Sequence, residues 1–247
     1  MPNPLPRLWP AIAAALAAAV TSMACGGVAH RGLLAATECQ EATSNRDALA
    51  VRFAPFLYLN PDEPFEILAV VAVFHPTRPL VAYHIFFEED ALLAGRGKSS
   101  DHEIAWVEYD PTTLEVSDVR TLWHRAVLRT EACISDARLS GQRPRLDVQW
   151  GQHGILPLGW EEAPSLRTRI LLRIHYLFMK HLGGVPGLES KGFDVSFRGS
   201  WADYLRFTKP VDVAAYLGDA VVAEHCEKAL AAQLHRTFKV KKEWPDP

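Results

Sequence analysis

Imidazole and carboxylate groups are concentrated in one short segment, Asp101-His102-Glu103. Together they suit a divalent cation, because anionic oxygen ligands offset the charge of the ion while neutral imidazole nitrogens complete its coordination. His102 and Glu103 are therefore candidate metal ligands, and Asp101 is a candidate catalytic base. His153 lies in a Gly-Gln-His-Gly turn that could expose its ring and bring it to His102 as a third ligand. The alternative is that each histidine makes one structural hydrogen bond in a loop.

The spacing of these residues restricts such a site. On a β-strand, His102 and Glu103 point to opposite faces, so both can reach one ion only if the chain is still a loop at Asp101 and His102. His84 lies in an aromatic run that is typical of a buried strand, which makes it a reserve candidate. Asp101 and Glu108 could form an acid and base pair, although solvated carboxylates at a strand end are commoner.

The elements that must position these residues are mostly strands in the first half of the chain. Apolar, β-branched and aromatic runs alternate with turns rich in Pro, Asp and Asn, which predicts four or five antiparallel strands. We expect a mainly β protein, an antiparallel, jelly-roll-like β-sandwich with peripheral helices. The predicted strands are Phe53–Leu59, Ile67–Phe74, Val81–Phe87, His102–Tyr109 and Val116–Arg129.

The second half of the chain is predicted to be helical. Leu166–Leu182 carries apolar residues at helical spacing and is followed by Gly183-Gly184, which is typical of a helix C-terminus. A second helix is expected within Val211–Phe238. The first helix also has a basic face, which suits either a membrane surface or partner, or the solvated side of a helix packed on a sheet. The basic residues are Arg167, Arg169, Arg173 and Lys180.

The N-terminus predicts export. Arg7 precedes an Ala-rich apolar run at Leu8–Met23, which is the pattern of a secretory signal. Ser22-Met23-Ala24-Cys25 resembles the lipobox of bacterial lipoproteins, in which the cysteine becomes the acylated first residue. We therefore expect a signal peptide at 1–24, a lipidated tether at 25–46 and one domain at 47–247. Simple secretion and an uncleaved anchor are the alternatives.

Composition excludes several classes of function. Among 247 residues, 49% are hydrophobic and 22% are charged, which is ordinary for a globular domain, and the net charge of −3 includes no basic block suited to nucleic acid. Gly95–Ser99 resembles the end of a phosphate-binding loop, but Leu92 stands where the first glycine belongs, so we expect no nucleotide.

The four cysteines lie far apart, without the close pairs of structural zinc sites. Export favours disulfides. With Cys25 acylated, three thiols remain, and Cys133 with Cys226 is the expected pair. Four tryptophans could line a carbohydrate or lipid groove, or could equally pack in a core. They are Trp123, Trp150, Trp160 and Trp201.

Several segments, in order, resemble one family. Ala54–Pro64 has an apolar strand followed by Pro-Asp-Glu-Pro, and Tyr83–Phe87 is an aromatic strand. His102-Glu103 with Trp106, and then the Gly-Gln-His-Gly turn, follow in the same order. This pattern resembles the vacuolar-protein-sorting-associated family related to necrosis-inducing proteins. The resemblance implies a β-sandwich and, in the necrosis-inducing branch, a divalent metal bound by His, Asp and Glu beside a surface that engages membrane sphingolipids.

The chain departs from the family motif at two positions. Ala105 replaces its Asp and Val107 replaces its Glu, so the implied ligand set reduces to His102, Glu103 and His153.

We therefore expect an exported, lipid-anchored bacterial envelope protein that binds a lipid, a glycan or another envelope protein. One alternative is a hydrolase of phosphoester or glycan bonds, in which His102, Glu103 and His153 hold a divalent metal ion and Asp101 is the base. The other is a purely structural lipoprotein.

Overall fold

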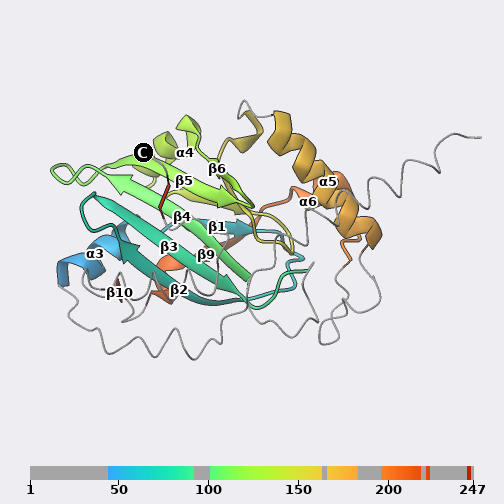
Figure 1. Ribbon diagram of the computed structural model, residues 1–247, viewed down its shortest axis with the longest axis horizontal. Coiled ribbons are helices and arrows are strands. Elements are labelled where there is room, and N and C mark those ends of the chain that lie inside the picture. The colour runs from blue at the N-terminus through green and yellow to red at the C-terminus, as the bar shows by residue number, and fades with distance from the viewer. Residues whose placement is uncertain are drawn as a thin grey trace, which may run out of the picture.

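The computed structural model describes residues 44–91, 101–162, 166–182, 196–217, 221–222 and 244–245. Two β-sheets face each other and the helices lie around them (Figure 1). The fold is mainly β, so the predicted sandwich with peripheral helices is confirmed. The strands are β1 Phe56–Leu59, β2 Ile67–Phe74, β3 Leu80–Phe87, β4 Asp101–Tyr109, β5 Val116–Trp123, β6 Ala126–Leu128, β7 Arg145–Val148, β8 Ile155–Pro157, β9 Lys209–Asp212 and β10 Val221–Val222. The helices are α3 Ser44–Phe53, α4 Glu131–Leu139, α5 Leu166–Leu182 and α6 Trp201–Tyr204, with 3-10 turns η3 at Trp160–Glu162 and η4 at Val213–Tyr216.

The larger sheet has six strands in the order β10-β2-β3-β4-β5-β6. Neighbouring strands in this sheet are antiparallel, except that β10 runs parallel to β2. The smaller sheet has the order β8-β7-β1-β9, with β1 parallel to β7 and the other pairs antiparallel. Parallel neighbouring strands need a long connection. The chain between β1 and β7 provides it, because it forms strands β2 to β6 of the larger sheet.

The main core lies between the inner faces of the two sheets. Alternate residues of β3 and β4 enter it, because side chains along a strand point to opposite faces. Val81, Tyr83, Ile85 and Phe87 meet Leu57, Leu146, Val148 and Ile155 of the smaller sheet in one buried cluster. The opposite side of β3 and β4 forms a second, smaller cluster with Leu80, Ile104, Trp106 and Leu122.

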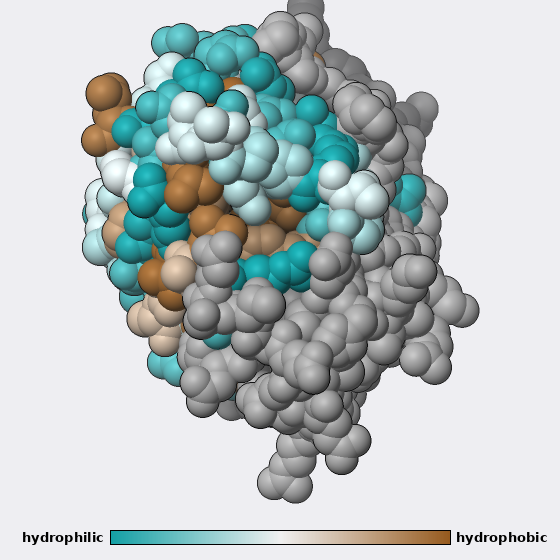
Figure 2. Space-filling model, turned by 90° about the vertical axis from the view of Figure 1, so that its left-hand side faces the viewer, coloured by the Kyte–Doolittle hydropathy of each residue, from teal (hydrophilic) through white to brown (hydrophobic). Residues whose placement is uncertain are grey.

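A separate aromatic core lies where α5 and α6 pack at one end of the sandwich (Figure 1). Trp123, Trp150 and Trp160 are at most 3% exposed within it, so core packing accounts for these three rings. The opposite end carries α3, and the described part of its surface is mostly hydrophilic around a hollow in which hydrophobic residues are exposed (Figure 2).

Several predicted elements match and others need correction. The helix Leu166–Leu182 is confirmed as α5. The predicted strand Phe53–Leu59 starts only at Phe56, because α3 extends from Ser44, inside the expected tether, to Phe53. The single strand Val116–Arg129 is interrupted by a turn at His124, whose positive φ of 53° ends β5 and allows β6 to fold back.

The predicted helix within Val211–Phe238 is absent from the part of that range that is described, where β9, η4 and β10 occur instead. The rest of the range lies outside the described residues, as do the expected signal, the tether up to residue 43, and Cys25. Among the ranges given above, no helix has both the length and the apolar character to cross a bilayer.

Candidate functional site

The geometry of β4 determines on which face of the sheet each predicted site residue lies, and therefore which of these residues can be in contact. β4 begins at Asp101, so the segment is already a strand and not a loop. Asp101 pairs with Phe87 of β3, and His102 pairs with Phe86. Because Phe87 belongs to the core between the sheets, Asp101 and Glu103 face this interior, whereas His102 faces the outer side of the larger sheet.

His153 meets Asp101 on the inner side. Its Nδ1 lies 3.1 Å from Oδ2 of Asp101, and its Nε2 lies 3.2 Å from Oε1 of Glu63. The side chain of His153 is 0% exposed, and its ring stacks on Phe87 at a centroid distance of 3.9 Å. We call Glu63, Asp101 and His153 the buried ion triad.

A strained turn between β7 and β8 presents the ring of His153 to both carboxylates. Gly151 has a φ of +65° and His153 a φ of +53°, so two residues of this turn adopt the left-handed conformation. The turn is tied to the triad, because the backbone N–H of Gly151 donates to Oε2 of Glu63 at 2.8 Å. Glu63 therefore holds both the backbone of the turn and the imidazole that the turn carries.

The charge of His153 follows from these contacts. Burial by itself lowers the pKa of an imidazole, but the negative charge of Glu63 and the hydrogen bonds to Asp101 and Glu63 outweigh this effect and raise the pKa of His153 to about 10. At neutral pH the ring is therefore an imidazolium that donates from both nitrogens. In this state it has no lone pair for a metal ion and cannot accept a proton as a general base.

The predicted metal ligands His102, Glu103 and His153 are not brought together. Nε2 of His102 lies 3.0 Å from Nδ1 of His84 on the outer side of β4, and the ring of His102 stacks on Phe86. Glu103 is buried on the inner side. In the part of the chain that the structure describes, no group of three or more His, Cys, Asp or Glu is arranged to hold a metal ion.

The predicted acid and base pair is also separated. Asp101 and Glu108 stand seven residues apart on β4, roughly 23 Å at the usual rise of a strand. Glu108 instead accepts from Arg78 at 2.8 Å. Asp101 and His153 are thus the two predicted site residues that the structure brings together, and Glu63 joins them.

Sequence reasoning missed a second polar network, centred on Gln149. Its Oε1 accepts from Nε1 of Trp123 at 2.7 Å and lies 3.1 Å from Nε2 of His124. Its Nε2 lies 2.9 Å from Oε1 of Gln152, 3.0 Å from the hydroxyl of Tyr204 and 3.3 Å from Nδ1 of His175. We call this set the Gln149 network.

The Gln149 network gathers side chains from distant elements. Gln149 follows β7, His124 lies in the β5–β6 turn, and His175 comes from α5. Tyr204 ends α6, whose start is fixed by a capping box at Ser200. No short motif of the sequence contains the network, so local spacing could not have revealed it.

His175 has the opposite electrostatics to His153. Burial, followed by the neighbouring ring of His124, lowers the pKa of His175 to about 3. The two rings lie 4.3 Å apart in an edge-to-face arrangement. His175 is therefore neutral over the whole physiological range of pH.

Two further titratable groups are shifted by burial. The pKa of Asp147 rises to about 7, although Arg145 opposes the shift, and the pKa of the Cys133 thiol rises to about 12. Cys133 is buried, and its Sγ lies 3.5 Å from the carbonyl oxygen of Arg145. Its expected partner Cys226 lies outside the described residues, so that disulfide stays a prediction.

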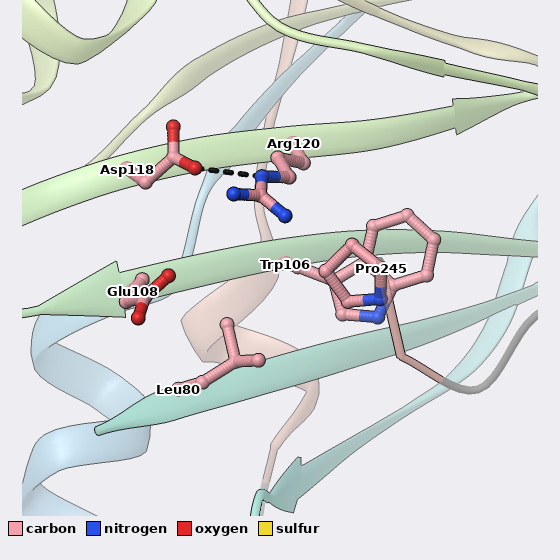
Figure 3. A pocket seen from close by; sticks show the side chains of 6 residues that line it. All are labelled: Leu80, Trp106, Glu108, Asp118, Arg120 and Pro245. Atoms are coloured by element: carbon pink, nitrogen blue, oxygen red, sulfur yellow. Dashed lines mark hydrogen bonds and ion pairs between the residues drawn. The ribbon is translucent and has the colours of Figure 1, made fainter. Parts of the chain in front are cut away.

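A small pocket lies on the outer side of the larger sheet (Figure 3). Its empty volume is about 130 Å³, below the few hundred Å³ or more of typical ligand sites. Arg120 beside it donates to Asp118 at 2.7 Å, and Glu108 is paired with Arg78. The lining residues are Leu80, Trp106, Glu108, Asp118, Arg120 and Pro245.

Comparison of the chain with protein families, with curated proteins and with solved structures gave no match, so function has to be argued from the geometry above.

Proposed function

We propose that the chain is an exported, lipid-anchored envelope protein with a binding role, in which the buried ion triad stabilises the fold and performs no catalysis. One observation carries the second half of this proposal. Both ring nitrogens of His153 are engaged by carboxylates, and its side chain is 0% exposed. A catalytic base or a metal ligand needs an available lone pair and access to a substrate, and His153 has neither in this state.

The arrangement of the other predicted groups supports the same conclusion. His102 faces away from Asp101, on the outer side of β4. The segments that resemble the vacuolar-protein-sorting-associated family agree with a recognition protein whose metal motif is degenerate. Membership of that family is part of this proposal and rests on the sequence segments alone.

The anchor is tested by following Cys25. The full chain and its Cys25→Ser variant are expressed in a bacterium that is fed radioactive palmitate. We expect the label on the unaltered chain, in the membrane fraction, and loss of the label in the variant, because only the thiol can carry the diacylglycerol. Label that persists in Cys25→Ser, or an unlabelled chain that is released from the cell, contradicts the anchor.

The hydrolase alternative is tested by elemental analysis of the purified protein beside His102→Ala. This substitution lies on the outer side of β4 and leaves the buried ion triad intact. We expect no stoichiometric divalent metal in either protein and no hydrolysis of model phosphoester or glycan substrates. One metal ion per chain that disappears with His102→Ala, together with an activity that disappears with it, would establish the hydrolase instead.

A further inference from the structure

The outward side of α5 carries exposed apolar residues. Ile170 is 49% exposed and Leu177 is 42% exposed. They are seven residues apart, which is two helical turns, so they lie on the same side of α5. The opposite side packs Leu172, Tyr176 and Met179 into the aromatic core. The helix is thus anchored along one side and presents a second apolar ridge outward.

Basic residues flank this ridge. Arg169, Arg173 and Lys180 are exposed and lie next to the ridge at the 100° spacing of an α-helix. The 17 residues of α5 include Arg167 as a fourth positive charge and no Asp or Glu, although the whole chain has a net charge of −3. α5 is therefore locally basic, although the net charge of the whole chain is negative.

Aromatic side chains hold part of this basic row in place. The guanidinium of Arg173 lies 4.6 Å from the ring centroid of Trp201 in α6, and Nζ of Lys180 donates to the hydroxyl of Tyr176 at 3.1 Å and to the carbonyl oxygen of Gly199 at 3.2 Å. These contacts hold the charged groups of Arg173 and Lys180 at defined positions beside α6 and Gly199. Figure 1 shows α5 and α6 together at one end of the sandwich, away from α3.

A surface of this composition fits one kind of partner best. Exposed Ile and Leu favour contact with hydrocarbon, while Arg and Lys beside them favour phosphate groups, and an anionic lipid bilayer offers both in adjacent layers. Nucleic acid offers phosphate but no hydrocarbon for the ridge. An acidic protein is the competing partner, and the experiment below distinguishes it.

We propose that the outward face of α5 binds the surface of an anionic lipid bilayer, with Ile170 and Leu177 entering the interface and Arg169, Arg173 and Lys180 contacting lipid phosphates. This contact goes beyond the acyl anchor. It adds a second point of attachment that orients the sandwich with the α5 and α6 end towards the membrane.

The test uses the chain from residue 25 onward carrying Cys25→Ser, so that neither an acyl group nor the apolar signal run Leu8–Met23 contributes, and measures co-sedimentation with vesicles. One set of vesicles contains phosphatidylcholine mixed with phosphatidylglycerol, and the other contains phosphatidylcholine alone. We expect binding to the anionic set, weakened by added salt. Arg169→Gln with Arg173→Gln should lower the partition coefficient about five-fold for each charge removed. Ile170→Ser with Leu177→Ser should lower it by a similar factor or more.

Matched controls separate the face of α5 from general surface effects. Leu139→Ser with Val51→Ser removes two apolar residues that are 88% and 48% exposed on α4 and α3, and Lys209→Gln removes an exposed charge on β9. We expect these variants to partition as the parent does, with all variants showing the parent's thermal unfolding. Equal binding to both sets of vesicles, equal effects of test and control variants, or binding to an acidic peptide without binding to vesicles would overturn the proposal.

Discussion

His153 and His175 are the same residue type in two polar clusters, yet the structure gives them opposite charges. His153 lies between two carboxylates, and its pKa is raised to about 10. His175 lies against the amide of Gln149 and the ring of His124, and its pKa is lowered to about 3. Burial lowers the pKa of both. The difference shows that the formal charge of the neighbours decides the protonation of a buried histidine in this fold.

The comparison also assigns the two clusters different roles in stability. The buried ion triad joins the first turn of the domain to the β7–β8 turn through charge, so removing His153 leaves two carboxylates without a cation in the interior. The Gln149 network carries no formal charge at neutral pH, and the amide of Gln149 has several partners in it. We therefore expect the triad to be sensitive to substitution and to high pH, and the network to be sensitive to acid.

The largest effect is expected for His153→Asn. Asparagine tolerates the left-handed φ of +53° but carries no charge, so the two carboxylates remain buried without a cation. We expect a loss of about 3–5 kcal/mol in the free energy of unfolding, measured by urea denaturation. Adding Glu63→Gln should restore part of this loss, because it removes one of the unbalanced charges. A double variant that is no more stable than the single one would contradict the charge argument.

The second effect is a loss of stability at alkaline pH. His153 has an ordinary pKa of 6.5 when the chain is unfolded and about 10 when it is folded, so the folded state binds more protons between these values. The stabilisation is complete below pH 6.5 and is lost as pH rises towards 10, by an amount on the order of a few kcal/mol. Urea midpoints across this range should fall for the unaltered chain and change much less for His153→Asn. Parallel curves for the two proteins would mean that His153 is not the titrating group.

A smaller effect is expected on the acid side, from His175. Its pKa is lowered from 6.5 to about 3 in the folded state, so the unfolded state binds more protons in this range and stability falls as pH decreases from 6.5. Because His175 keeps some exposure to solvent, we expect about 1–2 kcal/mol.

His175→Phe isolates this acid effect. Several exposed carboxyl groups with lowered pKa, among them Asp110, Asp203 and Asp212, also lose their ionised form in acid. The difference between His175→Phe and the unaltered chain removes their contribution. Thermal unfolding should show a smaller loss in the variant between neutral pH and pH 4, and an unchanged loss would contradict the lowered pKa.

The sequence predicted elements better than it predicted contacts. The bounds of α5 follow from its apolar spacing, and β3 and β4 begin within one residue of the predicted strands. The alternation rule also stated that His102 and Glu103 diverge on a strand. The predicted strand already began at His102, and its pairing with β3 extends it by one residue, to Asp101, which the local pattern does not show.

The members of the two clusters could not be predicted for a related reason. His153 and Glu63 are separated by 90 residues, and Gln149 and Tyr204 by 55, so their contacts arise only when both sheets and α6 have packed. Glu63 was visible as part of a turn motif, but its role depends on the distant His153. His124 was predicted inside a strand, because its positive φ has no signal such as a following glycine.

The smallest change in stability is expected for Gln149→Glu, which is also the most direct test of the comparison. The substitution keeps the size of the side chain and places a carboxylate beside both His124 and His175, as Glu63 is placed beside His153. The cost of burying this charge is largely offset by the protonation of a histidine, so the net change at neutral pH should be about 1 kcal/mol. The pKa of His175, followed by NMR of its ring protons, should rise from about 3 to above its ordinary value of 6.5. The reverse substitution, Glu63→Gln, should lower the pKa of His153. If both histidines kept their original pKa values, shape and burial would control their protonation, and the charge of the neighbours would not.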